Sequence, residues 1–145
     1  MVYCRHLIAL MQISSATTRR LSSVQALRQK AEELITTVNE LNEQLKQLEL
    51  SSQAPFPLDE PLDPSHLPNE LTLRQAQSLQ YHYFSLILDI NTPLAYPWSG
   101  IYTYAKQSTH AFDQIQKSVA SVAQASRSAI VATRDIRIDA SCSSL

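Results

Sequence analysis

Hydrophobic residues recur at helical spacing over most of the chain. The clearest stretch is 21–50, in which the apolar positions alternate in steps of four and three residues: Leu27, Ala31, Leu34, Val38, Leu41, Leu45 and Leu48. This spacing predicts a helix with one apolar seam, capped at its start by Ser22 or Ser23. Because Ile35 widens the seam and its edges hold few complementary charges, we expect it to pack inside the chain. A dimerising coiled coil is the alternative.

The stretch before it and the central stretch are also periodic. A helix is expected over 2–14, followed by a break or cap at 14–18, because Ser and Thr side chains there compete for backbone hydrogen bonds. The stretch 71–90 predicts a helix with Thr72 at its N-cap. Its apolar residues cover much of the circumference, so we expect this helix to be central. Two prolines, Pro93 and Pro97, are expected to end it.

The last periodic stretch predicts a helix from about Ser108 to residue 138. Its apolar seam consists mostly of small side chains, which would let a neighbouring helix approach closely: Ile115, Val119, Val122, Ser126, Ala129, Thr133 and Ile136. Residues 139–145 lack the pattern and are expected to fray.

Proline dominates residues 51–70, which hold Pro55, Pro57, Pro61, Pro64 and Pro68. Proline removes amide donors and disfavours helix before it, so we expect an extended, solvent-facing and flexible loop. The apolar patterns on its two sides look like halves of one core. The sequence therefore predicts a single all-α domain over residues 1–145, of about four helices, with this Pro-rich loop inside it.

Composition excludes several classes of protein. Gly100 is the only glycine, so glycine-rich phosphate loops and dinucleotide fingerprints are absent. The net charge of −1 leaves no basic footprint for nucleic acid. No run of ~18 apolar residues is present, so we expect no membrane association. The residues before Glu32 are rich in Arg and Ser, as in a mitochondrial transit peptide. An ordinary helix pair is favoured, because the apolar pattern continues without a break.

The chain offers few groups for catalysis or metal binding. Cys4 and Cys142 form neither a disulfide framework nor a zinc motif, which makes a reducing compartment the default. His6 lies two positions from Cys4, so on a helix their side chains would point apart. His82 is interpreted as a half-buried histidine hydrogen-bonded to a neighbouring helix. We therefore predict no enzyme, no catalytic, cofactor-binding or metal residues, and no cofactor in this chain.

Aromatic residues gather in the stretch 78–98, "SLQYHYFSLILDINTPLAYPW". Large rings bury large areas, so Tyr81, Tyr83 and Trp98 are expected to anchor the structure together with the seam from Leu27 to Leu48. The corner "YPW" is interpreted as structural, with a ligand-binding shelf as the alternative.

This aromatic stretch resembles a known family. "LQYHYFSLILDINTPL", followed by "AYPW", is similar to the middle homology region, or fungal-specific transcription factor domain, of zinc binuclear-cluster regulators. The family commonly has a His-Arg-Pro turn where this chain has Asn91, Thr92 and Pro93. "RRLSSVQALRQKAEELITTVNELNEQLKQL" resembles an earlier family helix, without its usual following tryptophan. "SVAQASRSAIVATRDI" is similar to the family's "C-x-x-A-A-R-x-I" helix, with the cysteine absent. The resemblance covers residues 5–138.

The resemblance implies a regulatory and interaction domain of a nuclear transcription factor. Protein partners or self-association, and a small-molecule effector, would go with that role. The family's DNA-binding zinc cluster needs six cysteines, so zinc and DNA contact are implied only for an N-terminal module that this chain lacks. We therefore expect a fragment, a truncated product or a remnant. The alternatives are a stand-alone coiled-coil interaction protein, which would fit the cytoplasm, and a small-molecule sensor that uses the aromatic corner.

Overall fold

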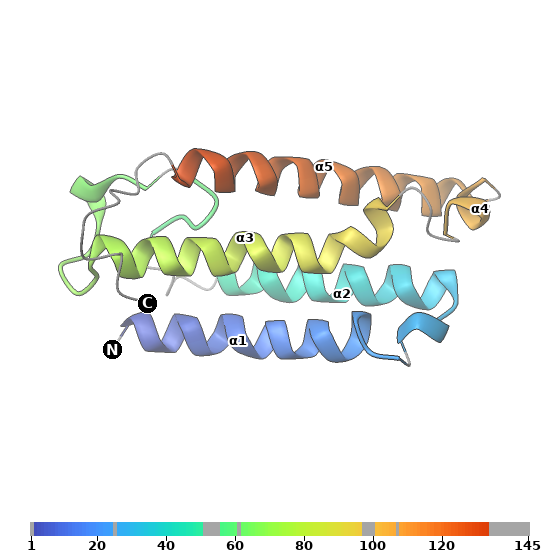
Figure 1. Ribbon diagram of the computed structural model, residues 1–145, viewed down its shortest axis with the longest axis horizontal. Helices are drawn as coiled ribbons and strands as arrows, with labels where there is room; N and C mark the ends of the chain where they lie inside the picture. Colours follow the sequence, from blue (N-terminus) through green and yellow to red (C-terminus); the bar gives the residue numbers. More distant parts are fainter. Residues whose placement is uncertain are drawn as a thin grey trace, which may run out of the picture.

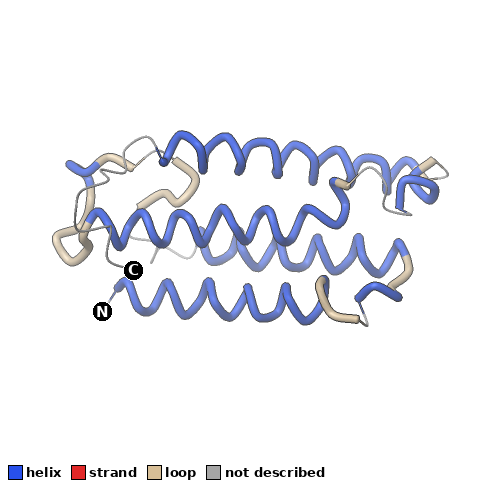
Figure 2. The backbone as a smooth tube through the Cα atoms, in the orientation of Figure 1, coloured by secondary structure: helices blue, strands red, loops and turns tan. Residues whose placement is uncertain are grey.

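The computed structural model describes residues 2–24, 26–50, 56–60, 62–96, 101–106 and 108–133, and these residues are all helix, turn or loop. The α-helices within them are α1 (Val2–Leu21), α2 (Ala31–Leu50), α3 (Leu73–Ala95), α4 (Ile101–Ala105) and α5 (Thr109–Thr133). Two short 3₁₀ helices, η1 (Ala26–Arg28) and η2 (Pro64–His66), lie in the connections. Figure 2 shows the helices in blue and the loops that connect them in tan. The predicted all-α class is confirmed: four helices are long, and α4 is a single short addition.

The long helices run back and forth along one axis, with α3 at the centre (Figure 1). Helix α3 packs most extensively against α5 and, on another side, against α1 and α2. Helices α2 and α5 run in the same direction but touch little. This arrangement confirms the central position expected for the stretch 71–90.

Helix α3 begins where the sequence predicts and ends later. The Thr72 hydroxyl accepts a hydrogen bond from the Gln75 amide at 3.2 Å, and the Gln75 side chain accepts one from the Thr72 amide at 3.0 Å. This is a complete capping box. The prediction that Pro93 ends the helix is wrong, because the helix continues to Ala95. Pro93 lacks the amide that would donate to the Asp89 carbonyl, and the helix ends two residues later, at Ala95. Pro97 lies outside the described residues.

The boundary between α1 and α2 also differs from the prediction. The expected break at 14–18 is wrong: α1 is continuous there, and the buried Thr17 hydroxyl donates to the Ile13 carbonyl at 2.9 Å. The turn falls instead between Leu21 and Ala31. The long helix therefore starts ten residues later than predicted. Ser23 accepts from the Ala26 amide at 3.2 Å, so it caps η1.

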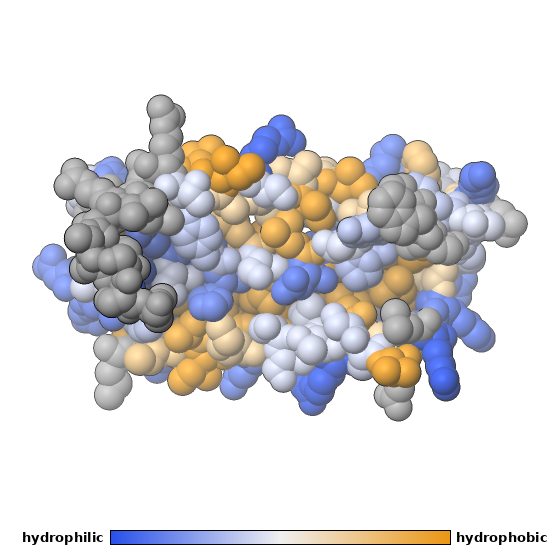
Figure 3. All heavy atoms as spheres, viewed as in Figure 1, coloured by the Kyte–Doolittle hydropathy of each residue, from blue (hydrophilic) through white to orange (hydrophobic). Residues whose placement is uncertain are grey.

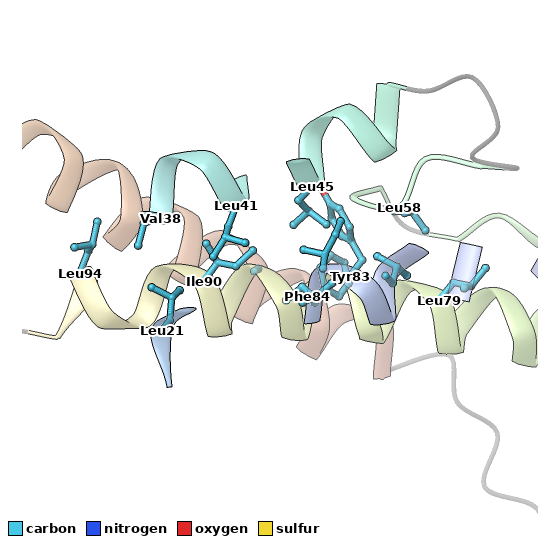
Figure 4. Close-up of a cluster of buried hydrophobic side chains, with 14 of the residues drawn as sticks. Leu21, Val38, Leu41, Leu45, Leu58, Leu79, Tyr83, Phe84, Ile90 and Leu94 are labelled. Atoms are coloured by element: carbon cyan, nitrogen blue, oxygen red, sulfur yellow. The ribbon is translucent and has the colours of Figure 1, made fainter. Parts of the chain in front are cut away.

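The predicted apolar seam forms the centre of the core from Leu34 onward. Val38 and Leu41 have no exposed surface, and Leu45 has almost none. Figure 4 shows these three side chains pointing from α2 toward α3. Burying each such side chain contributes about 1.5–3 kcal/mol. The seam thus packs inside the chain, as favoured above, although Leu27 belongs to η1 and not to the helix.

The Pro-rich stretch is not solvent-facing throughout. Phe56 and Leu58 are buried in the core. The Gln80 side-chain amide donates to the carbonyl oxygens of Leu58 at 3.3 Å and Glu60 at 2.6 Å. Residues 56–60, named the strap below, are therefore held against α3. The prediction of an extended, solvent-facing loop is wrong for the strap, because its apolar residues Phe56 and Leu58 are buried in the core although they show no helical spacing.

Helix α5 starts next to Ser108, as predicted, and the Ser108 hydroxyl accepts from the Ala111 amide at 3.4 Å. The predicted seam is correct only in part. Ile115 is buried as predicted, and Val122, Ser126 and Ala129 are half-buried, but Val119 is 42% exposed. The buried row is Ala111, Ile115, Ser118 and Ala125. Hydrophobic residues also reach the surface between the helices on the face shown in Figure 3. The tail 139–145, expected to fray, lies outside the described residues.

Candidate functional site

A groove of about 780 Å³ lies between α2 and α5. Its floor is formed by α3 through Tyr83, Phe84, Ile87 and Asn91. The groove exists because α2 and α5 both pack against α3 and hardly contact each other. Its α2 wall is polar and charged. Its α5 wall consists largely of small side chains: Ser118, Ala120, Ser121, Ala125 and Ser128.

A network of side-chain hydrogen bonds joins the three helices inside the groove. Asn42 and Asn91 exchange two amide hydrogen bonds, each of 3.0 Å. Asn91 also donates to the Ile87 carbonyl at 2.9 Å and accepts from the Ser118 hydroxyl at 3.0 Å. Asn91 is 1% exposed and thereby uses both of its donors and both acceptor positions of its side-chain oxygen. A fully satisfied buried amide fixes how α2, α3 and α5 are aligned.

Acidic groups gather at the other end of the groove. The Tyr83 hydroxyl donates to Glu49 Oε2 at 3.2 Å, and Asp59 of the strap lies beside Glu49. Burial, and then the charge of Asp59, raise the pKa of Glu49, while the hydrogen bond from Tyr83 and the charge of Lys46 oppose this rise. Burial, and then the charge of Glu49, raise the pKa of Tyr83. Within the described ranges, neither carboxylate makes an ion pair.

The expected aromatic anchors have separate outcomes. Tyr83 is 6% exposed and contacts Phe84 edge to face, so its anchoring role is confirmed. Tyr81 is half-buried; its hydroxyl is buried and has no hydrogen-bond partner among the described residues. Burial raises the pKa of Tyr81. Trp98 and Pro97 of the predicted aromatic corner lie outside the described residues, whereas Tyr96 is the C-cap residue of α3 and is 46% exposed.

The histidine and cysteine expectations are met in part. His82 is half-buried as expected, but the hydrogen bond to a neighbouring helix is wrong, since it makes none with the described residues. Cys4 is exposed, whereas His6 is buried with its Nδ1 atom 3.0 Å from the Val2 carbonyl, so the two side chains do point apart. In the described part of the chain, no cluster of His, Cys, Asp or Glu is suited to hold a metal ion. Nor is any described helix both long and apolar enough to span a membrane.

The residues that build the groove were not evident from the sequence. Asn91 stood out only as a departure from the family's turn, and Ser118 lay one position before the predicted seam. A polar residue that follows an apolar run in a central helix was the available signal for Asn91. Nothing in the sequence connects Glu49 with Asp59 and Tyr83, because they come together only when the strap folds back. Comparisons with protein-family models, curated proteins and solved structures found no match for the chain.

Proposed function

We propose that this chain is a regulatory domain that binds a protein partner in the control of transcription, in the nucleus. The resemblance to the fungal-specific transcription factor domain supports this role. The stretch containing "LQYHYFSLILDINTPL" forms α3, and most of "SVAQASRSAIVATRDI" lies in α5. Among the described helices, α3 and α5 make the most extensive contact with each other. Both motif stretches therefore serve helix packing, and the proposed role needs no catalytic residue.

The groove between α2 and α5 is the observation that carries the interaction role. Two parallel helices flank an open floor, which is the geometry that receives a third helix in a groove. The small side chains Ser121, Ala125 and Ser128 on α5 leave room for a close helix–helix approach. Polar groups along α2, such as Asn39 and Lys46, suit a reversible partner because they are hydrated when the groove is empty.

A reporter assay tests the proposal. The chain is fused to an unrelated DNA-binding module, and expression of a reporter gene under that module's site is measured. The fusion should change expression, and Ser121→Arg, which fills the groove, should abolish the change. Gln12→Arg on the exposed face of α1 is the matched control and should keep it. If neither the parent nor the control fusion changes expression at equal protein levels, the transcriptional role is wrong.

The family assignment has its own test. The nucleotide sequence upstream of the Met1 codon either encodes an in-frame six-cysteine module with a basic linker or does not. Such a module would supply the DNA contact and the zinc that the resemblance implies. Without it, the chain would be a remnant that retains only the interaction surface.

The stand-alone coiled coil is distinguished by its seam. Leu41 is fully buried inside the chain, and Leu34 packs against the same core. Introducing Leu34→Glu and Leu41→Glu should therefore unfold the whole domain, measured by circular dichroism. A variant that loses a dimer in sedimentation while its helices stay folded would favour the coiled coil.

A further inference from the structure

A second cavity, of about 170 Å³, lies where the strap meets α3 and α5. The strap lines it with Asp59 and Glu60, and α3 lines it with Gln80 and Phe84. This cavity is distinct from the groove, although Asp59, Phe84 and Ser128 line both. Its volume is below the ~300–1,000 Å³ of drug-sized ligand pockets, so its occupant must be small.

The walls of this strap cavity carry opposite charges. The strap side is lined by two acidic residues, Asp59 and Glu60. The α5 side is lined by Arg127 and Ser128. Arg127 donates through Nε to the Ala123 carbonyl at 3.1 Å, and it makes no ion pair within the described part of the chain. Hydrogen-bond acceptors and a fixed positive charge therefore lie on different walls of one small space.

Gln80 supplies an independent sign that a ligand belongs there. It is 1% exposed, and its Nε2 atom donates to the strap carbonyls of Leu58 and Glu60. These two bonds fix the amide orientation, because exchanging its oxygen and nitrogen would break both. The Oε1 atom has no hydrogen-bond partner among the described residues. A buried acceptor without a partner is costly, so a donor from a bound molecule would stabilise this arrangement.

We propose that the strap cavity binds a small α-amino acid. Its ammonium group is held by the strap carboxylates and offers a hydrogen to Gln80 Oε1. Its carboxylate faces Arg127 and Ser128, which match a planar anion with charged and neutral donors. A short apolar side chain rests against Phe84 and Val131, which also line the cavity. Binding does not depend on the transcriptional role, since it is measured on the isolated chain.

Isothermal titration of the full chain with L-alanine tests the site. Propylamine and propionate each carry only one of the two charges, so each should bind at least tenfold more weakly than L-alanine. Arg127→Gln and Asp59→Asn each remove one charge-assisted contact and should weaken L-alanine binding about tenfold or more. Lys117→Gln is the matched control: it removes a charge from α5 at the groove, away from the strap cavity, and should leave binding unchanged.

Three outcomes would overturn the proposal. L-alanine that gives no binding heat at millimolar concentration would mean that the cavity holds no amino acid. Propylamine that binds as tightly as L-alanine would make the site one for simple cations. Equal L-alanine affinity in Arg127→Gln and the parent chain would remove the carboxylate contact. Arg127 is exposed and, among the described residues, bonds only within its own helix turn, so this variant should keep its fold, which circular dichroism checks.

Discussion

Replacing Asn91 with alanine should destabilise the fold more than any other single polar change in the groove. The side chain is buried and makes its three interhelical hydrogen bonds with Asn42 and Ser118. Asn91→Ala deletes all of them at once. Asn42 is half-buried and can turn toward water in the groove, whereas Ser118 is 3% exposed and would keep an unsatisfied hydroxyl.

The size of the effect follows from the number of lost bonds. A hydrogen bond contributes about 1 kcal/mol net, so three interhelical bonds give a loss of about 3 kcal/mol in the free energy of unfolding. Domains of this kind are stable by about 5–15 kcal/mol, so the variant should fold but unfold at clearly lower denaturant. Ser118→Ala removes only one of these bonds and should cost about 1 kcal/mol.

Urea unfolding followed by circular dichroism measures both changes. The double variant should be about 1 kcal/mol more stable than the two single losses predict, because both remove the same Ser118–Asn91 bond. Asn39→Ala provides the control: Asn39 also lines the groove on α2, but it makes no side-chain hydrogen bond with the described residues. It should change stability by less than about 0.5 kcal/mol.

A loss below about 1 kcal/mol for Asn91→Ala would refute this reasoning, because the network would then contribute no more than a surface contact. Additive losses in the double variant would show that the bond between Ser118 and Asn91 is not formed in solution.

Three other changes test separate parts of the fold. The folded pKa of Glu49 is raised above 4.5, chiefly by burial and then by Asp59, so its stabilising contribution is present below 4.5 and lost as pH rises through the folded pKa. Between pH 4.5 and the folded pKa of Glu49, the melting temperature should fall more with rising pH in the parent chain than in the Glu49→Gln variant. Leu41→Ala should cost about 2–5 kcal/mol in urea unfolding, while Leu50→Ala, on a 69% exposed residue, should cost little. Thr72→Ala breaks the capping box and should cost about 1 kcal/mol in the same assay.

The long helices could be predicted from sequence because their apolar spacing is regular. The seam through Val38 and Leu41 gave the correct buried face, and Thr72 gave the correct start of α3. Helix ends were less predictable. Thr17 favours a break by its local chemistry, but in the fold it is buried and donates to its own helix, so tertiary packing overrides the local preference.

The groove and the position of the strap could not be predicted from the sequence, because they depend on contacts between residues far apart in the chain. Ser118 is buried and donates to Asn91, 27 positions earlier, whereas the neighbouring Val119 is 42% exposed. Phe56 and Leu58 show no periodicity, and the strap is held by their burial together with the hydrogen bonds from the Gln80 amide. Apolar periodicity identifies the buried face of a single helix. Where several rotations of that helix bury similar apolar residues, a hydrogen bond from a buried polar side chain decides between them.

The central position of α3 has a consequence for how the molecule opens. Helix α5 is joined to α1 and α2 almost entirely through α3, so a fluctuation that separates α3 from α5 frees a whole helix while the other three stay together. In hydrogen exchange, the amides of α5 would then become accessible as one unit, at a lower free energy than those of α3. An amino acid bound between the strap and α5 would link α5 to the strap and so slow the hydrogen exchange of the α5 amides.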